Sequence, residues 1–257
     1  MVRYLSGGGD AVANLYDYGI PVFNAGRDTP RRRVRCTAGW GTCDLERGPV
    51  PVPAEARPHP GSDGAMVVVD HSTGRTYEFW RARRDGASWT ARWGGVAALP
   101  DYRAPSGEGT LPTGAGVSRL AGVVRLSEVR NGRIPHALVL STDNACRGAH
   151  RHPAVKSDGR SSRADCVPEG ARIQLDPRVD LGAIRGMSRG ERMVARALQT
   201  YGAYVIDNGA ARMAFSFERP RSKLTDPYPN VGLHSDYYHM DRIPWGRLRV
   251  LRSWDGG

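Results

Sequence analysis

Two carboxylates and three tryptophans lie close together in one short part of the chain. This stretch, residues 66–93, reads MVVVDHSTGRTYEFWRARRDGASWTARW and contains Asp70, Glu78, Trp80, Trp89 and Trp93. Two carboxyl groups can cleave a glycosidic bond, one as acid and the other as base or nucleophile. Flat aromatic rings pack against the apolar faces of sugars. The combination predicts a glycan-binding groove in which Asp70 and Glu78 are catalytic and the tryptophans bind substrate.

The same stretch predicts three consecutive antiparallel strands. Residues 66–70, 76–81 and 88–93 are rich in β-branched and aromatic side chains, and turn residues separate them. The first separator is HSTG, and the second is Asp85-Gly86, a strong two-residue hairpin signal. We therefore expect a β-meander with one face turned to the groove.

The length of the first loop decides whether Asp70 belongs to that face. With Asp85-Gly86 at the tip of the second turn, Trp80 faces Ala91 and Glu78 faces Trp93, while a five-residue first loop adds Asp70 to the same side. The carboxylates would then be diagonal neighbours, about 7–8 Å apart, which suits an inverting hydrolase. Glu78, enclosed by aromatic rings, would be the acid and the better hydrated Asp70 the base. A four-residue loop would instead remove Asp70 from this face.

A structural interpretation of these residues is equally open. The tryptophans would form a core, Glu78 would pair with a nearby arginine, and Asp70 would cap a turn. A third carboxylate, Asp207, has the same two interpretations, because the triplet DNG at 207–209 is a turn signal and could also end at the groove.

Composition favours a single mainly β domain spanning residues 1–257. The 32 glycines and 18 prolines are spread along the chain without a repeat, as is typical of short strands joined by turns. We expect an antiparallel, jelly-roll-like β-sandwich with loop-rich segments at 1–60 and 219–247. The net charge of +11 is scattered rather than gathered. It can attract acidic glycans or reflect composition bias, and we expect no nucleic-acid partner.

The four cysteines predict two local disulfides and an oxidising compartment. Cys36 pairs with Cys43 and Cys146 with Cys166 in this interpretation, because neither spacing is that of a metal site. No apolar run is long enough to cross a bilayer. The segment MVRYLSGGGD is not a signal peptide, so we expect a secreted protein whose leader has been removed.

One segment, residues 188–201, predicts an amphipathic helix packed outside the sandwich. Ser188 and Glu191 form a capping box, and five apolar residues follow on one stripe. The remaining strands are expected at residues 134–142, 170–175, 203–207, 213–218 and 248–252.

Other residues are weaker candidates for chemistry. His136 and Tyr204 are expected to contact substrate, although His136 shares its strand face with leucines. The loop at 143–167 contains His150 and His152 without the regular spacing of a metal site, so we expect no metal and no cofactor. The aromatic and histidine-rich segment 228–245 is expected to be a surface loop capable of ligand contact.

Several pieces of the sequence resemble a known group of proteins. These are PVPAEARPHPGSDGAMVVVDHSTGRTYEFW, RIPHALVLS, EGARIQLDPRVDL and RALQTYGAYVIDNG. They are similar to secreted, mostly uncharacterised actinobacterial proteins with fungal relatives, over roughly residues 20–210. The resemblance implies export and a jelly-roll or concanavalin-like β-sandwich. It marks five positions within recurrent motifs, namely Asp70, Glu78, His136, Tyr204 and Asp207.

Three classes of function follow from these observations. The first is a secreted polysaccharide-degrading glycoside hydrolase that uses Asp70, Glu78 or Asp207. The second is a lyase for an acidic glycan, with Tyr77, Tyr204 or His136 as base and an arginine neutralising the uronate. The third is a non-catalytic lectin-like or surface-interaction domain.

Overall fold

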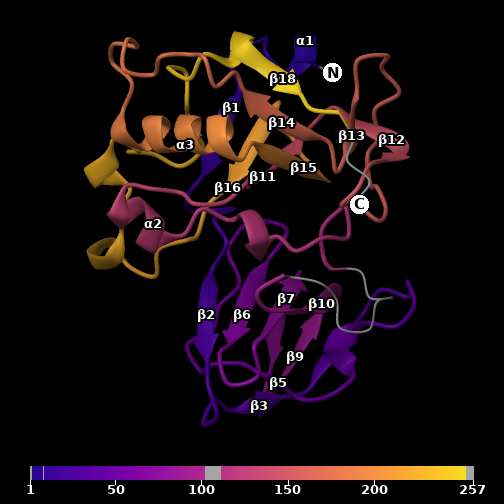
Figure 1. The fold of residues 1–257 in the computed structure, drawn as a ribbon. Helices are drawn as coiled ribbons and strands as arrows, with labels where there is room; N and C mark the ends of the chain where they lie inside the picture. The colour runs from indigo at the N-terminus through magenta and orange to yellow at the C-terminus, as the bar shows by residue number, and fades with distance from the viewer. Residues whose placement is uncertain (1, 8, 102–110, 253–257) are drawn as a thin grey trace.

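The computed structural model describes residues 2–7, 9–101 and 111–252, and it is mainly β (Figure 1). The chain forms an upper lobe around a seven-stranded sheet and a lower lobe around a four-stranded sheet. Residues 22–98 build the lower lobe and are inserted between the first strand of the upper lobe and the rest of it.

The seven-stranded sheet is mixed. Its spatial order is β17 (Tyr238–His239), β1 (Ala11–Asn14), β16 (Met213–Ser216), β11 (Leu138–Thr142), β15 (Ala203–Asn208), β14 (Arg172–Leu175) and β18 (Leu248–Val250). The pairs β1–β16 and β11–β15 are parallel, and the other four pairs are antiparallel. Strands distant in sequence are therefore brought together in this lobe.

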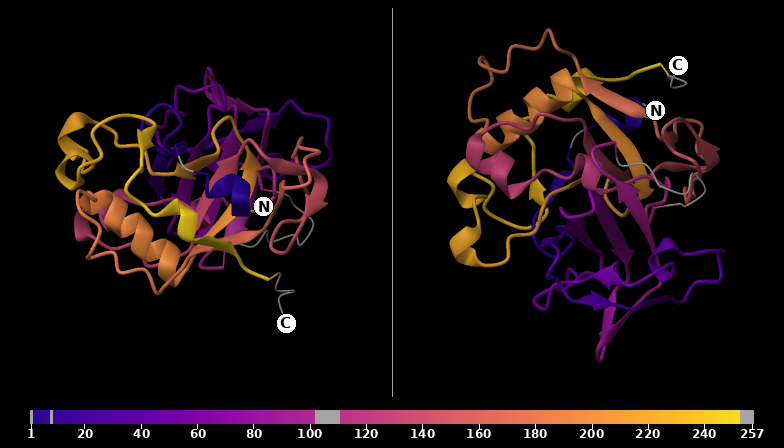
Figure 2. Two further views of the ribbon diagram at one scale, coloured as in Figure 1. Left: turned by 90° about the horizontal axis from the view of Figure 1, so that it is seen from above. Right: turned by 60° about the horizontal axis from the view of Figure 1, so that its bottom comes forward.

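One face of this sheet is covered by the predicted helix, α3 (Arg189–Thr200) (Figures 1 and 2). Its N-terminus is closed by the capping box, in which the Glu191 N–H donates to Ser188 Oγ at 3.1 Å and the Ser188 N–H donates to Glu191 Oε2 at 2.9 Å. Apolar residues of α3 join the main core with the inward side chains of β11, β14 and β15. Two short helices, α1 (Val2–Leu5) and α2 (Leu126–Asn131), lie in the same lobe.

The lower lobe contains the first hairpin of the predicted meander, but the predicted pairing of its third strand is wrong. The main sheet of this lobe has the order β10 (Trp93–Ala98), β7 (Arg75–Trp80), β6 (Met66–Asp70) and β2 (Val22–Ala25), and β2 pairs parallel to β6. The turn at Asp85-Gly86 joins β8 (Arg83–Asp85) to β9 (Ser88–Ala91) in a separate small sheet. The strand beside β7 is β10 instead, so that Trp80 faces Trp93 and Glu78 faces Gly95.

Small sheets flank the main sheet of the lower lobe, one of β4 (Val34–Cys36), β9 and β8, another of β3 (Arg31–Arg32) and β5 (Val50–Pro51). In the upper lobe β12 (Ala145–His150) pairs with β13 (Val167–Glu169).

Each lobe has its own apolar core, and a third cluster joins them. The joining cluster contains Ile20 and Val22 from the N-terminal part, Val67 of β6, and Leu120 and Val123 from the segment that returns to the upper lobe. Leu120 begins the short 3₁₀ helix η2 (Leu120–Gly122). Burial of this cluster fixes the two lobes against each other and so defines the space between them.

The expectation of purely antiparallel pairing is wrong. Five strand pairs in the described residues are parallel, and no sheet formed by those residues closes. Hairpin signals in a sequence report only neighbouring strands, whereas parallel pairs need long connections that leave no local pattern. The mainly β class is confirmed, but a jelly-roll sandwich is not.

Both predicted disulfides, Cys36–Cys43 and Cys146–Cys166, are present. None of the helices among the described residues is long and apolar enough to cross a membrane.

The Cys146–Cys166 crosslink should make the larger contribution to stability, because it closes a loop with a sequence separation of 20 residues. Replacing both cysteines by serine should lower the free energy of unfolding by about 3 kcal/mol. Chemical denaturation of the variant and of the wild type measures this difference. An unreduced protein with four titratable thiols would contradict the pairing itself.

Candidate active-site cleft

Asp70 and Glu78 lie on opposite faces of the lower sheet. The first hairpin has a four-residue loop, so that Asp70 pairs with Arg75 and Val67 with Glu78. Because side chains alternate along a strand, Asp70 then points to the face opposite Glu78. The predicted groove containing both carboxylates is therefore wrong, and loop length is the reason.

Asp70 is a buried turn cap. It is 0% exposed and accepts hydrogen bonds from the Ser72 N–H at 3.0 Å, Ser72 Oγ at 2.6 Å and Thr73 Oγ1 at 2.9 Å. Burial raises the pKa of Asp70, but these hydrogen bonds outweigh burial and leave the pKa below its usual value. Asp70 therefore caps a turn, as the structural interpretation of the sequence expected, and does not line a groove.

Glu78 is a buried anchor for the segment that connects the lobes. It is 1% exposed and accepts hydrogen bonds from Ser118 Oγ and, at 3.0 Å, from the Arg119 N–H. Burial raises the pKa of Glu78 despite these bonds. The Glu78 carboxylate therefore holds residues 118 and 119 in place and does not point into a ligand site.

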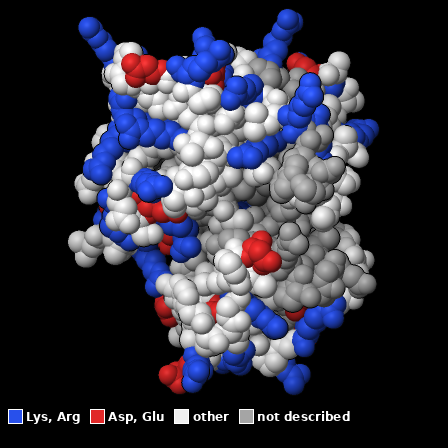
Figure 3. Space-filling view, in the orientation of Figure 1, with Lys and Arg blue, Asp and Glu red and all other residues white. Residues whose placement is uncertain are grey.

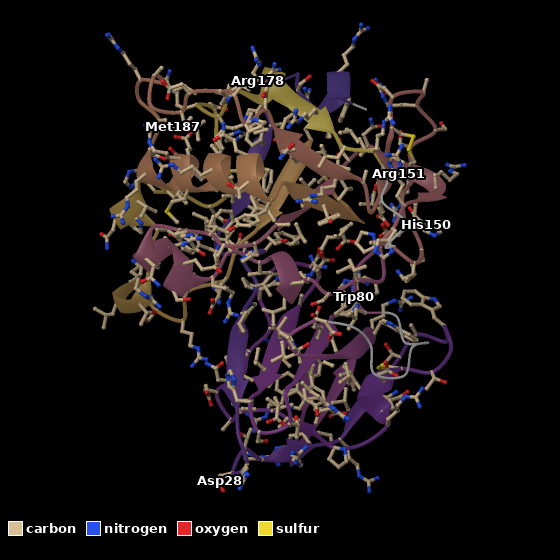
Figure 4. The ribbon with its side chains drawn as sticks, viewed as in Figure 1. Asp28, Trp80, His150, Arg151, Arg178 and Met187 are labelled. Carbon is tan, nitrogen blue, oxygen red and sulfur yellow. A yellow bond between two sulfur atoms is a disulfide. The ribbon has the colours of Figure 1, made fainter. Side chains whose placement is uncertain are left out.

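The three predicted tryptophans separate into two environments. Trp89 is buried in the lower core, so its predicted contact with substrate is wrong. Trp80 and Trp93 pair across β7 and β10 and face the space between the lobes, where Figure 4 labels Trp80. A third ring, Trp40, lies 5.9 Å from each of them between ring centroids and is 61% exposed.

The cleft between the two lobes consists of two adjoining cavities, which we call its halves. Its tryptophan half, lined by Trp40, Trp80 and Trp93, has a volume of about 580 Å³, and its tyrosine half, lined by Tyr18 and Tyr237, about 550 Å³. Both volumes fall within the range of about 300–1,000 Å³ common for ligand sites. The halves share four lining residues, Asp63, Arg119, Asp207 and Asn208, which we call the waist.

The waist brings carboxylates from the two lobes to one place. Asp207, at the end of β15, accepts a hydrogen bond from the Gly114 N–H at 3.0 Å and forms an ion pair with Arg119 at 2.7 Å. Burial raises the pKa of Asp207, and the opposing effect of Arg119 does not cancel it. Asp63 belongs to the lower lobe and accepts a hydrogen bond from Trp80 Nε1 at 3.1 Å.

A β-bulge explains why Asp207 reaches the cleft. Leu140 of β11 pairs with Val205, but the next residue, Ser141, pairs with Asp207, so β15 contains one extra residue at Ile206. Regular alternation would place Asp207 on the face of Val205, under α3. The bulge turns it to the opposite face, beside Ser141, because an extra residue re-aims the side chains that follow.

A second carboxyl pair lies beside the waist. Asp158 lines the tryptophan half and accepts a hydrogen bond from the Asn208 N–H at 3.1 Å, while Glu169 is 0% exposed behind it. The carboxyl oxygens of Glu169 have no donor among the described residues. Burial, and then the adjacent Asp158, raise the pKa of Glu169 to about 9, which favours the protonated form of Glu169 at neutral pH.

Gly114 shows how tightly these acids are packed. A Cβ atom at this position would lie 2.3 Å from Asp158 Oδ1 and 2.7 Å from Glu169 Oε1. A larger residue would displace these carboxyl groups, and the Gly114 N–H is the donor to Asp207. Gly114 therefore contacts the carboxyl group of Asp207 and lies against those of Asp158 and Glu169.

Three aromatic side chains with hydrogen-bonding groups line the tyrosine half, namely Tyr18, His59 and Tyr237. Tyr18 packs on His59, with 5.3 Å between ring centroids, and lies 6.3 Å from Tyr237. Burial, followed by the charge of Arg119, lowers the pKa of His59 to about 4. His59 is therefore uncharged at neutral pH.

Backbone strain is concentrated at the cleft. Arg81 has φ 51° and Tyr237 has φ 49°, and these are the two non-glycine residues with left-handed backbone in the described part of the chain. Arg81 lines the tryptophan half and Tyr237 the tyrosine half. Such conformations cost about 1–3 kcal/mol and cluster at functional sites.

The remaining candidates lie outside the cleft. His136 hydrogen-bonds to Glu128 at 3.1 Å, and Tyr204 contacts Arg172 beside a separate cavity of about 100 Å³. Tyr77 is buried in the lower core. None of these three residues lines either half of the cleft. His150 and His152 take part in no metal-binding group among the described residues, where the one such group contains the Cys36–Cys43 disulfide.

Sequence inspection missed most of the residues at the waist. Asp63 lies in the turn-like segment GSDG, and Arg119 directly precedes the short helix η2. Neither residue has a distinctive pattern of sequence neighbours. Trp40 had a usable signal, because an aromatic ring between two glycines in a disulfide-closed loop is placed for exposure. The predicted contact loop at 228–245 does supply Tyr237 and His239.

Comparisons with protein-family models, curated proteins and solved structures give no match to this chain.

The protonated Glu169 should make stability depend on pH. Its pKa is raised from 4.5 to about 9 in the folded protein, so the folded state binds the proton more strongly than the unfolded state. The resulting stabilisation is complete below about pH 4.5 and is lost as pH rises through about 9. Glu169→Gln has a similar shape, is uncharged at every pH, and removes this titration.

Melting temperatures of wild type and Glu169→Gln, measured from about pH 5 to pH 9, test this. The wild type should lose stability relative to the variant as pH rises, and exposed Glu55→Gln should show no such trend. A pH-independent difference would contradict the protonated pair.

Proposed function

We propose that this chain is a secreted, polysaccharide-degrading glycoside hydrolase whose active site is the interlobe cleft. The observation that carries the proposal is the waist, where Asp207 from the upper lobe and Asp63 from the lower lobe line the same space beside a tryptophan platform. Paired carboxyl groups flanking a bound sugar are the basic requirement for glycosidic cleavage. The two disulfides favour an extracellular location.

Trp40 is the ring best placed to bind a sugar. Trp40 is 61% exposed, more than any other tryptophan of the cleft. Each of the two stacked rings has a guanidinium beside it, Arg92 at 5.5 Å from the Trp40 centroid and Arg81 at 4.9 Å from the Trp80 centroid. Aromatic stacking on a sugar ring would hold the chain along the cleft so that one glycosidic bond lies at the waist.

Asp207 would be the general acid. Burial raises its pKa against the opposing charge of Arg119, so Asp207 binds a proton more readily than a free aspartate and can pass it to the leaving oxygen. After transfer, its carboxylate would be stabilised by Arg119 and by the Gly114 N–H, both already in place. Asp63 on the other wall would activate a water, which gives an inverting reaction. These roles replace those predicted for Glu78 and Asp70.

A lyase is a second candidate, supported by a specific observation in the tyrosine half. Tyr18, Tyr237 and His239 line it beside Arg119, and a lyase needs a base together with a cation that neutralises the uronate. The two reactions differ in their products, because only a lyase creates a double bond that absorbs ultraviolet light. A lectin would bind glycans and release nothing.

Asp207→Asn and Asp63→Asn should each lower cleavage by about 10²–10⁴-fold, because each removes a proton-transfer group. Release of reducing ends from a panel of neutral, acidic and cell-wall glycans measures this, with glycan binding followed in parallel. The control is Asp28→Asn, an exposed carboxylate at the far end of the lower lobe (Figure 4). Near-full cleavage by both waist variants would contradict the assignment.

A further inference from the structure

Charge is distributed unequally between the two halves of the cleft. Outside the waist, the tryptophan half is lined by three cations, Arg81, Lys156 and Arg160, and by one carboxylate, Asp158. The tyrosine half has no lysine or arginine outside the waist among its described lining residues, and one carboxylate, Asp10. On the visible face of the molecule basic side chains are widely scattered (Figure 3), so this difference is a property of the cleft.

The cations of the tryptophan half are available to a ligand. Among the described residues, no carboxylate lies within ion-pair distance of Arg81, Lys156 or Arg160, and all three are exposed. Lys156 Nζ donates to the Thr113 and Gly114 carbonyls at 2.7 and 2.8 Å, which orients the ammonium without neutralising it. Arg119, in contrast, is already paired with Asp207.

Arg81 is held in place by its backbone. Its N–H donates to the Asp63 carbonyl at 2.7 Å, and the Ala82 N–H donates to the Gly64 carbonyl at 2.9 Å. These bonds maintain the left-handed conformation at Arg81, and the guanidinium lies over the Trp80 ring. A cation held by an aromatic face keeps its full charge for a third partner.

We propose that the cleft binds an anionic glycan, with the sugar that bears the negative group in the tryptophan half and an uncharged sugar in the tyrosine half. The shared chemistry is an anionic substituent, either a uronate carboxylate or a sulfate ester, within reach of Arg81, Lys156 and Arg160. The inference rests on the proposed function for the location of the glycan and adds its charge and its direction along the cleft.

Binding to matched acidic and neutral glycans tests the inference. The probes are oligogalacturonate, oligoalginate, hyaluronan and chondroitin sulfate, each beside its carboxyl-reduced form, and chondroitin sulfate also beside its desulfated form. Asp63→Asn serves as the binding protein, so that no probe is degraded and the ion pair between Arg119 and Asp207 stays intact. At least one acidic probe should bind about tenfold more tightly than its neutral form, and this preference should weaken as salt rises.

Two substitutions test whether the preference for acidic probes arises in the tryptophan half. Arg81→Gln and Arg160→Gln should each lower acidic-probe affinity about two- to fivefold and the pair about tenfold, with neutral-probe affinity unchanged. The matched control is Arg83→Gln, which removes an exposed arginine two residues from Arg81 that does not line the cleft. Melting curves confirm that each variant is folded, and salt dependence of the parent protein gives a second measure.

The outcomes separate this inference from the proposed function. Preference for acidic probes without cleavage by the wild type supports the inference and rejects the hydrolase. Cleavage of neutral glycans alone supports the hydrolase and overturns the inference. Failure to bind any acidic probe, equal binding of acidic and neutral forms, or an unchanged preference in the double variant would also overturn it.

Discussion

The ion pair between Arg119 and Asp207 joins the two lobes and fixes the geometry of the cleft. The backbone of Arg119 is held by Glu78 of the lower sheet, and its guanidinium reaches Asp207 at the end of β15 in the upper sheet. Both side chains are largely buried, so losing one partner would leave an unpaired charge, which costs about 3–5 kcal/mol. The lobes must therefore keep the arrangement that satisfies this pair, and the candidate acid is held in place by the same constraint.

The seven-stranded sheet has two faces with different tasks. One face packs against α3 and forms the main apolar core, and the other presents short side chains, including Ala214, Ser216 and Ser141, to the cleft. Short side chains leave room for a ligand between the lobes. The bulge in β15 transfers Asp207 from the first face to the second, so a local irregularity of the sheet converts a buried position into a cleft position.

The sequence predicted features that depend on neighbouring residues and failed where distant residues decide. The capping box at Ser188, the strand at 66–70 and both disulfides are found as expected, because each has a local pattern. The face of Asp70 depended on one residue of loop length, and parallel pairing and the bulge before Asp207 leave no local pattern. Asp207 was therefore predicted as a site residue from its turn motif, whereas its ion-pair partner Arg119 was not predicted.

The central claim is that a glycan occupies the interlobe cleft with its cleavable bond at the waist. A crystal structure of Asp207→Asn with a bound oligosaccharide identified by the binding panel tests it most directly. The account predicts a sugar ring stacked on Trp40, a glycosidic oxygen beside residue 207, and the Asp63 carboxylate on the opposite side of the same sugar. An oligosaccharide bound outside the cleft, or one whose glycosidic bonds all lie away from the waist, would contradict the account.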